Sequence, residues 1–459
     1  MRFLPVLFAL AVAPLPLGQA ARPNVILVMT DDQGYPELSA HGNPVLNTPF
    51  LDKLHSQSVR FTDYHASPMC TPTRGSLMTG LDPARNGAIN VSSGRTLLRA
   101  NLPTMADLLR EQGYRTGIFG KWHLGDNYPY RPQDRGFEET LWFPSSHIGS
   151  VPDHWGNNYF DDTYRWNGKR KKFTGYCTDI FFDHAIDWIK RSAAAGEPFF
   201  AYLPITIPHA AMHVPEEDAA PFRKKFPEHE NKIGRYRGPE VRNPAAMFAG
   251  MMTRMDRGVG EVLDLLDELK IADNTLVLFT SDNGPHHEGG HMPGYFNSNG
   301  PLRGHKRDLY EGGIRVPLIA CWPGKVKAGT VSNHISAHWD LMPTLCELAG
   351  IRIPKHTDGI SYVPTLYGGK QKQHDYLYWE FHAQGKKQAI RMGDWKAVRL
   401  NLAKNPDAPI QLYNLAKDIG ETKDVAAQHP DVVKRIKPLF TSARVESGLF
   451  TLFPKRKLN

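Results

Sequence analysis

Two short apolar runs that end in acidic residues are the feature that most constrains how this chain can fold. Residues 24–30 (NVILVMT) stop at Asp31-Asp32, and residues 275–280 (TLVLFT) stop just before Asp282-Asn283. Apolar runs without regular alternation are typical of strands buried on both faces. Helical patterns separate these and similar runs, as expected for a parallel sheet with helices on both sides. The sequence therefore predicts an α/β fold with a large mixed, mostly parallel sheet sandwiched by helices.

Other predicted elements place polar side chains at strand ends. We expect helices that begin at Thr48-Pro49 and at Thr104, where Thr104 and Asp107 have capping-box spacing, further helices at 178–191 and 244–270, and a strand at 198–203 before Pro208-His209. Another strand-like run leads to Lys121-Trp122-His123, and an extended segment would point Lys121 and His123 to the same face. Ligands bind beyond the carboxyl ends of strands in such sheets, so these groups are predicted to meet at one rim.

The character of the sequence changes at about Gly369. Short alternating segments at 376–381, 389–392, 395–400 and 411–415 predict a small antiparallel sheet, with Gly393-Asp394 as a hairpin turn. A helical pattern follows at 430–443. We therefore expect a main domain at 21–368 and a smaller C-terminal subdomain at 369–459 that contains an antiparallel sheet and a helix.

The first 20 residues have the features of an export signal. Met1-Arg2 precede an apolar stretch from Phe3 to Leu17, and small residues stand before the expected cleavage point. The stretch is short and interrupted by proline, and no other window is apolar for long enough to span a membrane. We therefore expect a periplasmic or secreted protein without a stable membrane anchor.

The net charge and the number of cysteines indicate which kinds of partner and which covalent links to expect. The chain has 55 basic and 47 acidic residues, a formal net charge of +8, with basic clusters at 165–172 and 223–237. Such clusters favour an acidic partner, although solvated loops can have the same composition. Nucleic acid is not the expected partner, because no nucleic-acid module is recognisable and the chain is predicted to be exported. Four cysteines in so long a chain do not form a disulfide framework.

The segment Cys70-Thr71-Pro72-Thr73-Arg74-Gly75 places a thiol and a guanidinium at a predicted helix start. By chemistry alone, such a cysteine should have a lowered pKa and lie near bound anions. The segment, continued through Gly80, resembles the type I sulfatase signature C-x-P-x-R in its long form, with Thr73 in place of the more usual serine. Residues 412–415 and 420–422 are similar to the closing pattern of that family. The resemblance covers about residues 22 to 420.

The resemblance implies a formylglycine-dependent sulfatase of the alkaline-phosphatase-like superfamily. Cys70 would be oxidised to formylglycine by a formylglycine-generating enzyme, and the substrate would be a sulfate ester. The family's metal is Ca²⁺, with Mg²⁺ as the alternative, and the implied ligands are Asp31, Asp32, Asp282, Asn283 and residue 70. Carboxylate and amide oxygens suit either hard cation.

The resemblance also implies roles for the remaining site residues. Arg74 would orient the formylglycine hydrate, Lys121 would bind sulfate, and His123 would act as the base that releases sulfate. His209 would protonate the departing alcohol, for which its near-neutral ordinary pKa is suited, and Lys306 would contact the same oxygen. Arg303, His305 and Arg307 lie close enough in sequence to compete with Lys306 for this role.

The sequence leaves several alternatives open for the substrate and the function. The predicted export and net charge favour a sulfated carbohydrate as the substrate. A phosphonate or phosphate ester hydrolase could use the same groups, and a chain with unmodified Cys70 would be a non-catalytic binder of sulfated glycans. His287 and His291 have helical zinc-ligand spacing, but Gly289, Gly290 and Pro293 predict a loop beside the site. Residues 145–147 and 155–166 are further candidates for sugar contacts.

Overall fold

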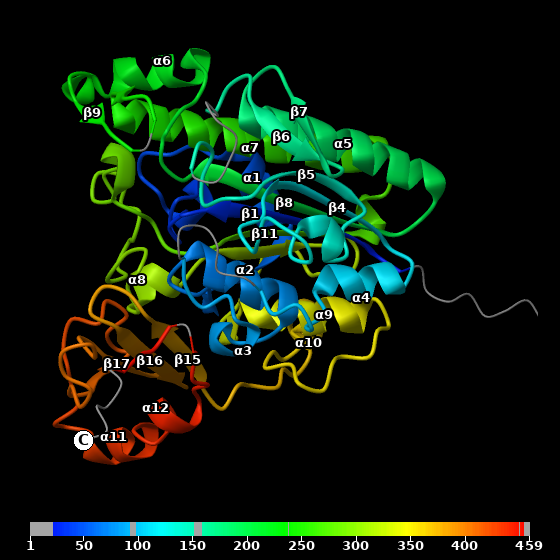
Figure 1. Ribbon diagram of the computed structural model, residues 1–459. Helices are drawn as coiled ribbons and strands as arrows, with labels where there is room; N and C mark the ends of the chain where they lie inside the picture. The colour runs from blue at the N-terminus through cyan, green and yellow to red at the C-terminus, as the bar shows by residue number, and fades with distance from the viewer. Residues whose placement is uncertain (1–21, 92–97, 151–157, 237, 449, 454–459) are drawn as a thin grey trace, which may run out of the picture.

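The computed structural model describes residues 22–91, 98–150, 158–236, 238–448 and 450–453 (Figure 1). The predicted export signal at 1–20 and part of the aromatic segment at 155–166 therefore lie outside the described residues. Among the helices that are described, none has both the length and the apolar character that crossing a membrane requires.

Within the described residues, ten strands form one large mixed sheet. In spatial order these are β13 (Thr330–Ser332), β2 (Ser58–Phe61), β12 (Leu318–Cys321), β11 (Thr275–Ser281), β1 (Asn24–Asp31), β8 (Phe199–Pro208), β4 (Arg115–Lys121), β5 (Glu139–Phe143), β6 (Thr163–Trp166) and β7 (Lys169–Lys172). The central strands from β11 to β5 are parallel, and β12, β6 and β7 pair antiparallel to their neighbours. The predicted fold class is confirmed.

Helices cover both faces of this sheet (Figure 1). On one side lie α1 (Pro49–Ser56), α5 (Cys177–Ala195) and α7 (Pro244–Glu268), with α6 (Glu216–Lys225) outside α7; on the other lie α2 (Cys70–Thr79), α3 (Pro83–Asn86), α4 (Met105–Glu111), α9 (Leu341–Leu348) and α10 (Val363–Leu366). Along β1, Ile26 and Val28 pack in the hydrophobic core on the side of α5 and α7. Leu27 and Met29 pack in a second core on the side of α4 and α9. The uninterrupted apolar run is explained by this burial on both faces.

The predicted helix starts are partly confirmed. Thr104 and Asp107 form the expected capping box at the start of α4, with reciprocal bonds of 2.8 and 3.1 Å. Thr48 precedes α1 but makes no capping bond to it. The carboxylate of Asp256 from α7 accepts instead from the first amides of α1, Phe50 N at 3.2 Å and Leu51 N at 2.8 Å. The cap of α1 is therefore a tertiary contact.

The C-terminal part contains a four-stranded antiparallel sheet, as predicted. Its strands are β15 (Leu377–Phe381), β16 (Lys387–Met392), β17 (Trp395–Arg399) and β18 (Gln411–Asn414), and Gly393-Asp394 forms the turn between β16 and β17. The single helix expected at 430–443 is instead two short helices, α11 (Pro430–Ile436) and α12 (Leu439–Ser442). Pro438 lies between them and cannot donate the amide hydrogen bond that a continuous helix requires.

Buried polar contacts join this sheet to segments beside the main sheet. Trp379 of β15 donates its indole hydrogen to the carbonyl of Ala66 at 2.9 Å. Lys396 of β17 pairs with Glu311 at 2.7 Å, and both side chains are fully buried. Glu311 begins α8 (Glu311–Ile314), which follows the loop that carries Lys306. The second sheet therefore fixes the position of a segment next to the predicted site.

Remaining described strands form two short pairs: β3 (Tyr64–His65) with β14 (Ser336–Ala337), and β9 (Ile233–Gly234) with β10 (Val241–Arg242).

Candidate functional site

The predicted site residues meet at the carboxyl ends of the central strands. Asp31 ends β1, Lys121 ends β4, and His209 directly follows β8. Asp282 and Asn283 follow β11, and Cys70 is the first residue of α2. All of these residues are buried, with Cys70 at 2% exposure. The topology thus brings together side chains that are up to 252 positions apart in the sequence, as for Asp31 and Asn283.

Arg74 connects three of these strand ends. Its guanidinium donates to Asp282 Oδ2 from Nη2 at 2.8 Å and from Nε at 3.2 Å, and Nη1 donates to the carbonyl of Lys121 at 2.9 Å. The same guanidinium lies 3.8 Å from Asp31 Oδ2. The Lys121 ammonium donates to Asp31 Oδ2 at 2.6 Å. Two buried cations therefore hold the carboxylates in place without using all of their oxygens.

The unused oxygens point to a cation. Asp31 Oδ1 and Asn283 Oδ1 are buried and have no hydrogen-bond partner among the described residues. Burial, together with the nearby Asp282 carboxylate, raises the pKa of Asp31 well above its ordinary value. Asn283 uses its amide hydrogens to donate to Asp32 Oδ1 at 2.7 Å, which leaves its oxygen as an acceptor. A divalent cation would satisfy both the orphaned oxygens and the excess negative charge.

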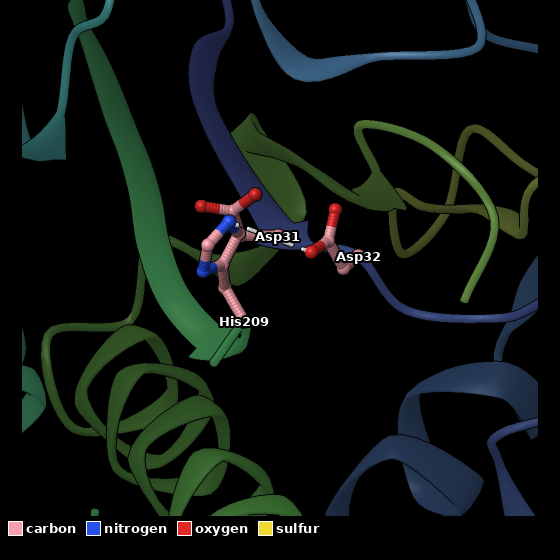
Figure 2. Close-up of side chains that lie close together, drawn as sticks. All are labelled: Asp31, Asp32 and His209. Atoms are coloured by element: carbon pink, nitrogen blue, oxygen red, sulfur yellow. Dashed lines mark ion pairs between the residues drawn. The ribbon is translucent and has the colours of Figure 1, made fainter. Parts of the chain in front are cut away.

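One arrangement of possible ligands differs from the set implied by the sequence. Ligand atoms of Asp31, Asp32 and His209 all lie within 4.8 Å of one another (Figure 2). His209 Nε2 is 3.6 Å from Asp32 Oδ2, which is the pair marked in Figure 2. The histidine expected to protonate a leaving group therefore lies against the carboxylates expected to hold the metal.

Cys70 differs from the expectation for a thiol at a helix start. Burial raises the pKa of the Cys70 thiol, and the Lys121 ammonium only partly offsets this effect. The prediction of a lowered pKa is wrong because desolvation and the carboxylates of Asp31 and Asp282 outweigh the local cations. The thiol is therefore neutral at pH 7, which argues against a cysteine thiolate as the nucleophile.

His209 and Lys306 form one hydrogen-bonded unit. The Lys306 ammonium contacts Asp32 Oδ2 at 2.7 Å, Glu288 Oε2 at 3.2 Å and His209 Nε2 at 3.3 Å. His209 Nδ1 donates to the carbonyl of Ala210, so in the neutral ring Nε2 is the acceptor that faces Lys306. Burial and the Lys306 charge lower the pKa of His209 well below its ordinary value, whereas Asp32 and Glu288 raise the pKa of Lys306 despite its burial. The unit holds its proton on Lys306.

His123 is placed by an irregular backbone. The strand β4 ends at Lys121, and His123 has a left-handed backbone with φ of 60°. The inference that Lys121 and His123 share a face of an extended segment is therefore wrong. Neither ring nitrogen of His123 has a hydrogen-bond partner among the described residues. Burial, with the charges of Lys121 and Arg74, lowers the pKa of His123 well below its ordinary value, so the ring is neutral and free to accept a proton.

Rings of aromatic and histidine residues enclose His209. His147 stacks on it with ring centroids 5.7 Å apart, and His286 stacks at 6.0 Å. Tyr236 contacts His147 and His209 edge-on, at 5.0 and 5.7 Å. These contacts fix the orientation of the His209 ring. The sequence indicated residues 145–147 as candidates for sugar contacts and did not reveal that His147 and His286 stack on His209.

Glu288 is the residue whose contribution the sequence did not reveal. Besides Lys306, its carboxylate accepts from Arg307 Nη2 at 2.6 Å. The only signal available was its position in the run 286–291 near Asp282-Asn283. This segment is irregular, as predicted: Gly289 has φ of 65° within the short 3₁₀ turn Glu288–Gly290. No group of three possible metal ligands among the described residues includes His287 or His291.

Comparisons with known proteins define the class of the protein. Residues 23–351 match the family model described as Sulfatase, and residues 304–445 match the model described as N-sulphoglucosamine sulphohydrolase, C-terminal. The chain belongs to the sulfatase family. It is a sulfuric ester hydrolase, in agreement with the function expected from the sequence.

Individual relatives cover most of the chain. N-acetylgalactosamine-6-sulfatase of Canis lupus familiaris is 32% identical over 405 residues, which is 83% of this chain and 72% of the relative. Arylsulfatase G of the same organism is 28% identical over 512 residues, covering 97% and 90%. The crystal structure of Ps i-CgsB is 31% identical, with a TM-score of 0.78 over 91% of this chain and 92% of that chain.

Proposed function

We propose that this sulfatase hydrolyses sulfate esters of carbohydrates with a formylglycine made from Cys70. The observation that carries the proposal is the buried Cys70 beside a group of oxygen ligands in which Asp31 Oδ1 and Asn283 Oδ1 have no partner among the described residues. A carbohydrate substrate is supported by the names of relatives such as N-acetylgalactosamine-6-sulfatase. It is also supported by a crystal structure of Ps i-CgsB, 31% identical to this chain, in complex with the oligosaccharide k-i-k-neocarrahexaose.

We propose Ca²⁺ as the resident cation, with Mg²⁺ as the alternative. The residues that would hold it are Asp31, Asp32, Asp282, Asn283 and the modified residue 70. Their donors are oxygens, and two of them are buried without a partner, which fits a hard cation. When bound, the cation would neutralise the sulfuryl oxygens and strengthen their attraction to the site.

The other side chains of the site have separate catalytic and positioning roles. When formed, hydrated formylglycine supplies the nucleophilic oxygen at position 70. Lys121 and Lys306 supply positive charge near that position, and both ammoniums oppose the rise in the pKa of Cys70. Arg74 keeps Asp282 and the end of β4 in place through its three hydrogen bonds.

Two proton transfers follow from the tautomers. Lys306 holds the proton of the pair, and its ammonium would give that proton to the departing alcohol oxygen, which leaves a neutral amine hydrogen-bonded to His209 Nε2. This differs in detail from the expectation that His209 alone is the acid. When sulfate is released, the neutral His123 can accept a proton from the remaining hydroxyl of the modified residue 70, since neither ring nitrogen of His123 has a partner among the described residues.

The proposal extends to maturation and location. Conversion of Cys70 requires a formylglycine-generating enzyme as a partner, and the expected signal at 1–20 supports export to the periplasm or beyond.

Release of inorganic sulfate from a panel of sulfated oligosaccharides tests the proposal. The protein should be co-expressed with a formylglycine-generating enzyme, and conversion verified as a loss of about 18 Da from the peptide that contains residue 70. We expect release by the converted protein and none by Cys70→Ala. Converted protein that cleaves phosphate or phosphonate esters but no sulfate ester would contradict the proposal. Unconverted protein that only binds sulfated glycans would instead support the non-catalytic alternative.

A further inference from the structure

The β6–β7 hairpin forms an unusually basic edge of the main sheet. Every residue of β7 is basic and exposed, and β7 is the outermost strand on this side of the sheet (Figure 1). We refer to its four residues, Lys169, Arg170, Lys171 and Lys172, as the hairpin cluster. A charged edge strand also prevents pairing with other chains, but one or two lysines suffice for that purpose.

The hairpin cluster is not neutralised by the protein. Among the described residues, none of its four side chains forms an ion pair with a carboxylate. Lys171 lies over the ring of Trp166 at 3.9 Å from the centroid, which fixes one charge against the hairpin. The other three side chains, those of Lys169, Arg170 and Lys172, are exposed.

The strand register divides the hairpin cluster between the two faces of the hairpin. Lys171 pairs with Tyr164 and Lys169 with Trp166, and Trp166 packs against His184 of α5. Because residues directly opposite share a face, Arg170 and Lys172 project on the other face together with Arg165. Arg165 and Arg170 are directly opposite, and like charges in that arrangement destabilise a strand pair. Arg165 donates to the carbonyl of Asp126 at 2.8 Å and lies over the ring of Trp142, so the fold holds this side chain, whereas Arg170 has no acidic partner among the described residues.

The same register relates the hairpin cluster to the active site. Lys121 is paired with Phe143, the adjacent pair is Trp142 with Arg165, and Tyr164 is paired with Lys171. Lys121 and Lys171 therefore lie in one row of the sheet, separated by three strand spacings, or roughly 14 Å. Phe143 and Tyr164, which lie between the two lysines, are buried, so a sugar chain held at the site would have to pass over the ends of these strands to reach the hairpin.

We propose that the β6–β7 hairpin is a second binding surface for a polysulfated polysaccharide, and that it holds a part of the chain distant from the ester being cleaved. This inference rests on the proposed action on sulfated carbohydrates and makes the substrate a polymer rather than a single sugar. Regularly spaced sulfates match a row of exposed cations through charge, without requiring a deep pocket.

A binding experiment without catalysis tests this surface separately from the reaction. Affinity for dextran sulfate is measured by calorimetry at several salt concentrations, in the full-length Cys70→Ala protein. The test variant is Lys169→Ser/Arg170→Ser/Lys172→Ser, which spares the lysine packed on Trp166. The matched control is Lys434→Ser/Arg435→Ser/Lys437→Ser, which removes the same charge from exposed positions on or beside α11. Thermal unfolding of each variant establishes that it is folded.

We expect the hairpin variant to lose at least about tenfold in affinity at ~0.1 M salt, and the control to change by less than about threefold. By analogy with phosphate contacts, the slope of log affinity against log salt should decrease by about two to three in magnitude. Equal losses of affinity in both variants would show that binding depends on net charge alone. An unchanged affinity in the hairpin variant would show that the hairpin is not a binding surface. Either result overturns the inference. Equally tight binding of single-stranded DNA with the same loss would overturn the assignment to sulfated glycans. Hydrolysis of small sulfate esters by converted parent protein decides the proposed function independently.

Discussion

Replacing Lys306 by methionine separates proton donation from charge stabilisation. The Lys306 ammonium contacts His209 Nε2 at 3.3 Å and two carboxylates, Asp32 at 2.7 Å and Glu288 at 3.2 Å. Methionine fills a similar volume but carries neither the charge nor the proton. Substrates should therefore differ in their sensitivity according to how much their leaving oxygen needs protonation.

The two effects have different magnitudes. Loss of a charged hydrogen-bonding group is worth about 1.5–3 kcal/mol, so all substrates should become slower by roughly 10- to 100-fold. Loss of a general acid costs a further factor of about 10² to 10⁴, but only where the leaving group is a poor one. A nitrophenol leaves readily as an anion, whereas a sugar alkoxide does not. We therefore expect kcat/KM for a sugar sulfate to fall at least about 100-fold more than kcat/KM for 4-nitrophenyl sulfate.

The assay is kcat/KM of converted protein on both substrates, with Lys121→Met as the matched control. Lys121 is also buried and pairs with one carboxylate, Asp31, at 2.6 Å, but it does not contact His209 in the described structure. The control should lose similar factors on both substrates. Equal losses for Lys306→Met would refute donation of the proton through the Lys306–His209 pair.

Three further predictions concern stability and metal binding. Burial raises the pKa of Asp256 to about 6, above its ordinary value, so the folded state binds this proton more tightly and the unfolding free energy falls as pH rises from about 4 to 6. Relative to Asp256→Asn, wild type should lose roughly 1 kcal/mol between pH 5 and pH 7 by denaturant unfolding; a pH-independent difference would contradict the assignment. Ca²⁺ at 100 times its Kd should stabilise chelator-treated protein by about 2.7 kcal/mol, measured as a rise in Tm, and Asp31→Asn should abolish this rise. Lys396→Met removes the 2.7 Å partner of the buried Glu311, which keeps its contacts with His65 and Arg315, and should cost about 1–3 kcal/mol, with partial recovery in Lys396→Met/Glu311→Gln. Additive losses in that double variant would show that the pair is not coupled.

Local sequence was sufficient to predict an element of the fold where one physical requirement determines that element. The run at 24–30 has to be buried on both faces, and that requirement predicted a buried strand followed by acidic residues. The capping box of Thr104 and the turn at Gly393-Asp394 depend on neighbours in sequence, and both form as expected. The boundary between the two parts near residue 369 stays a prediction.

Properties that depend on distant neighbours were decided by the tertiary structure alone. The pKa of Cys70 rises rather than falls, because desolvation and the carboxylates of two other strands outweigh the local helix and arginine. Asp256, from another helix, replaces Thr48 as the cap of α1. The sequence by itself thus determined the family, the sheet and the residues at its rim. Only the folded chain decided their protonation and partners, because electrostatic and hydrogen-bonding energies depend on separations in space, which sequence spacing does not give.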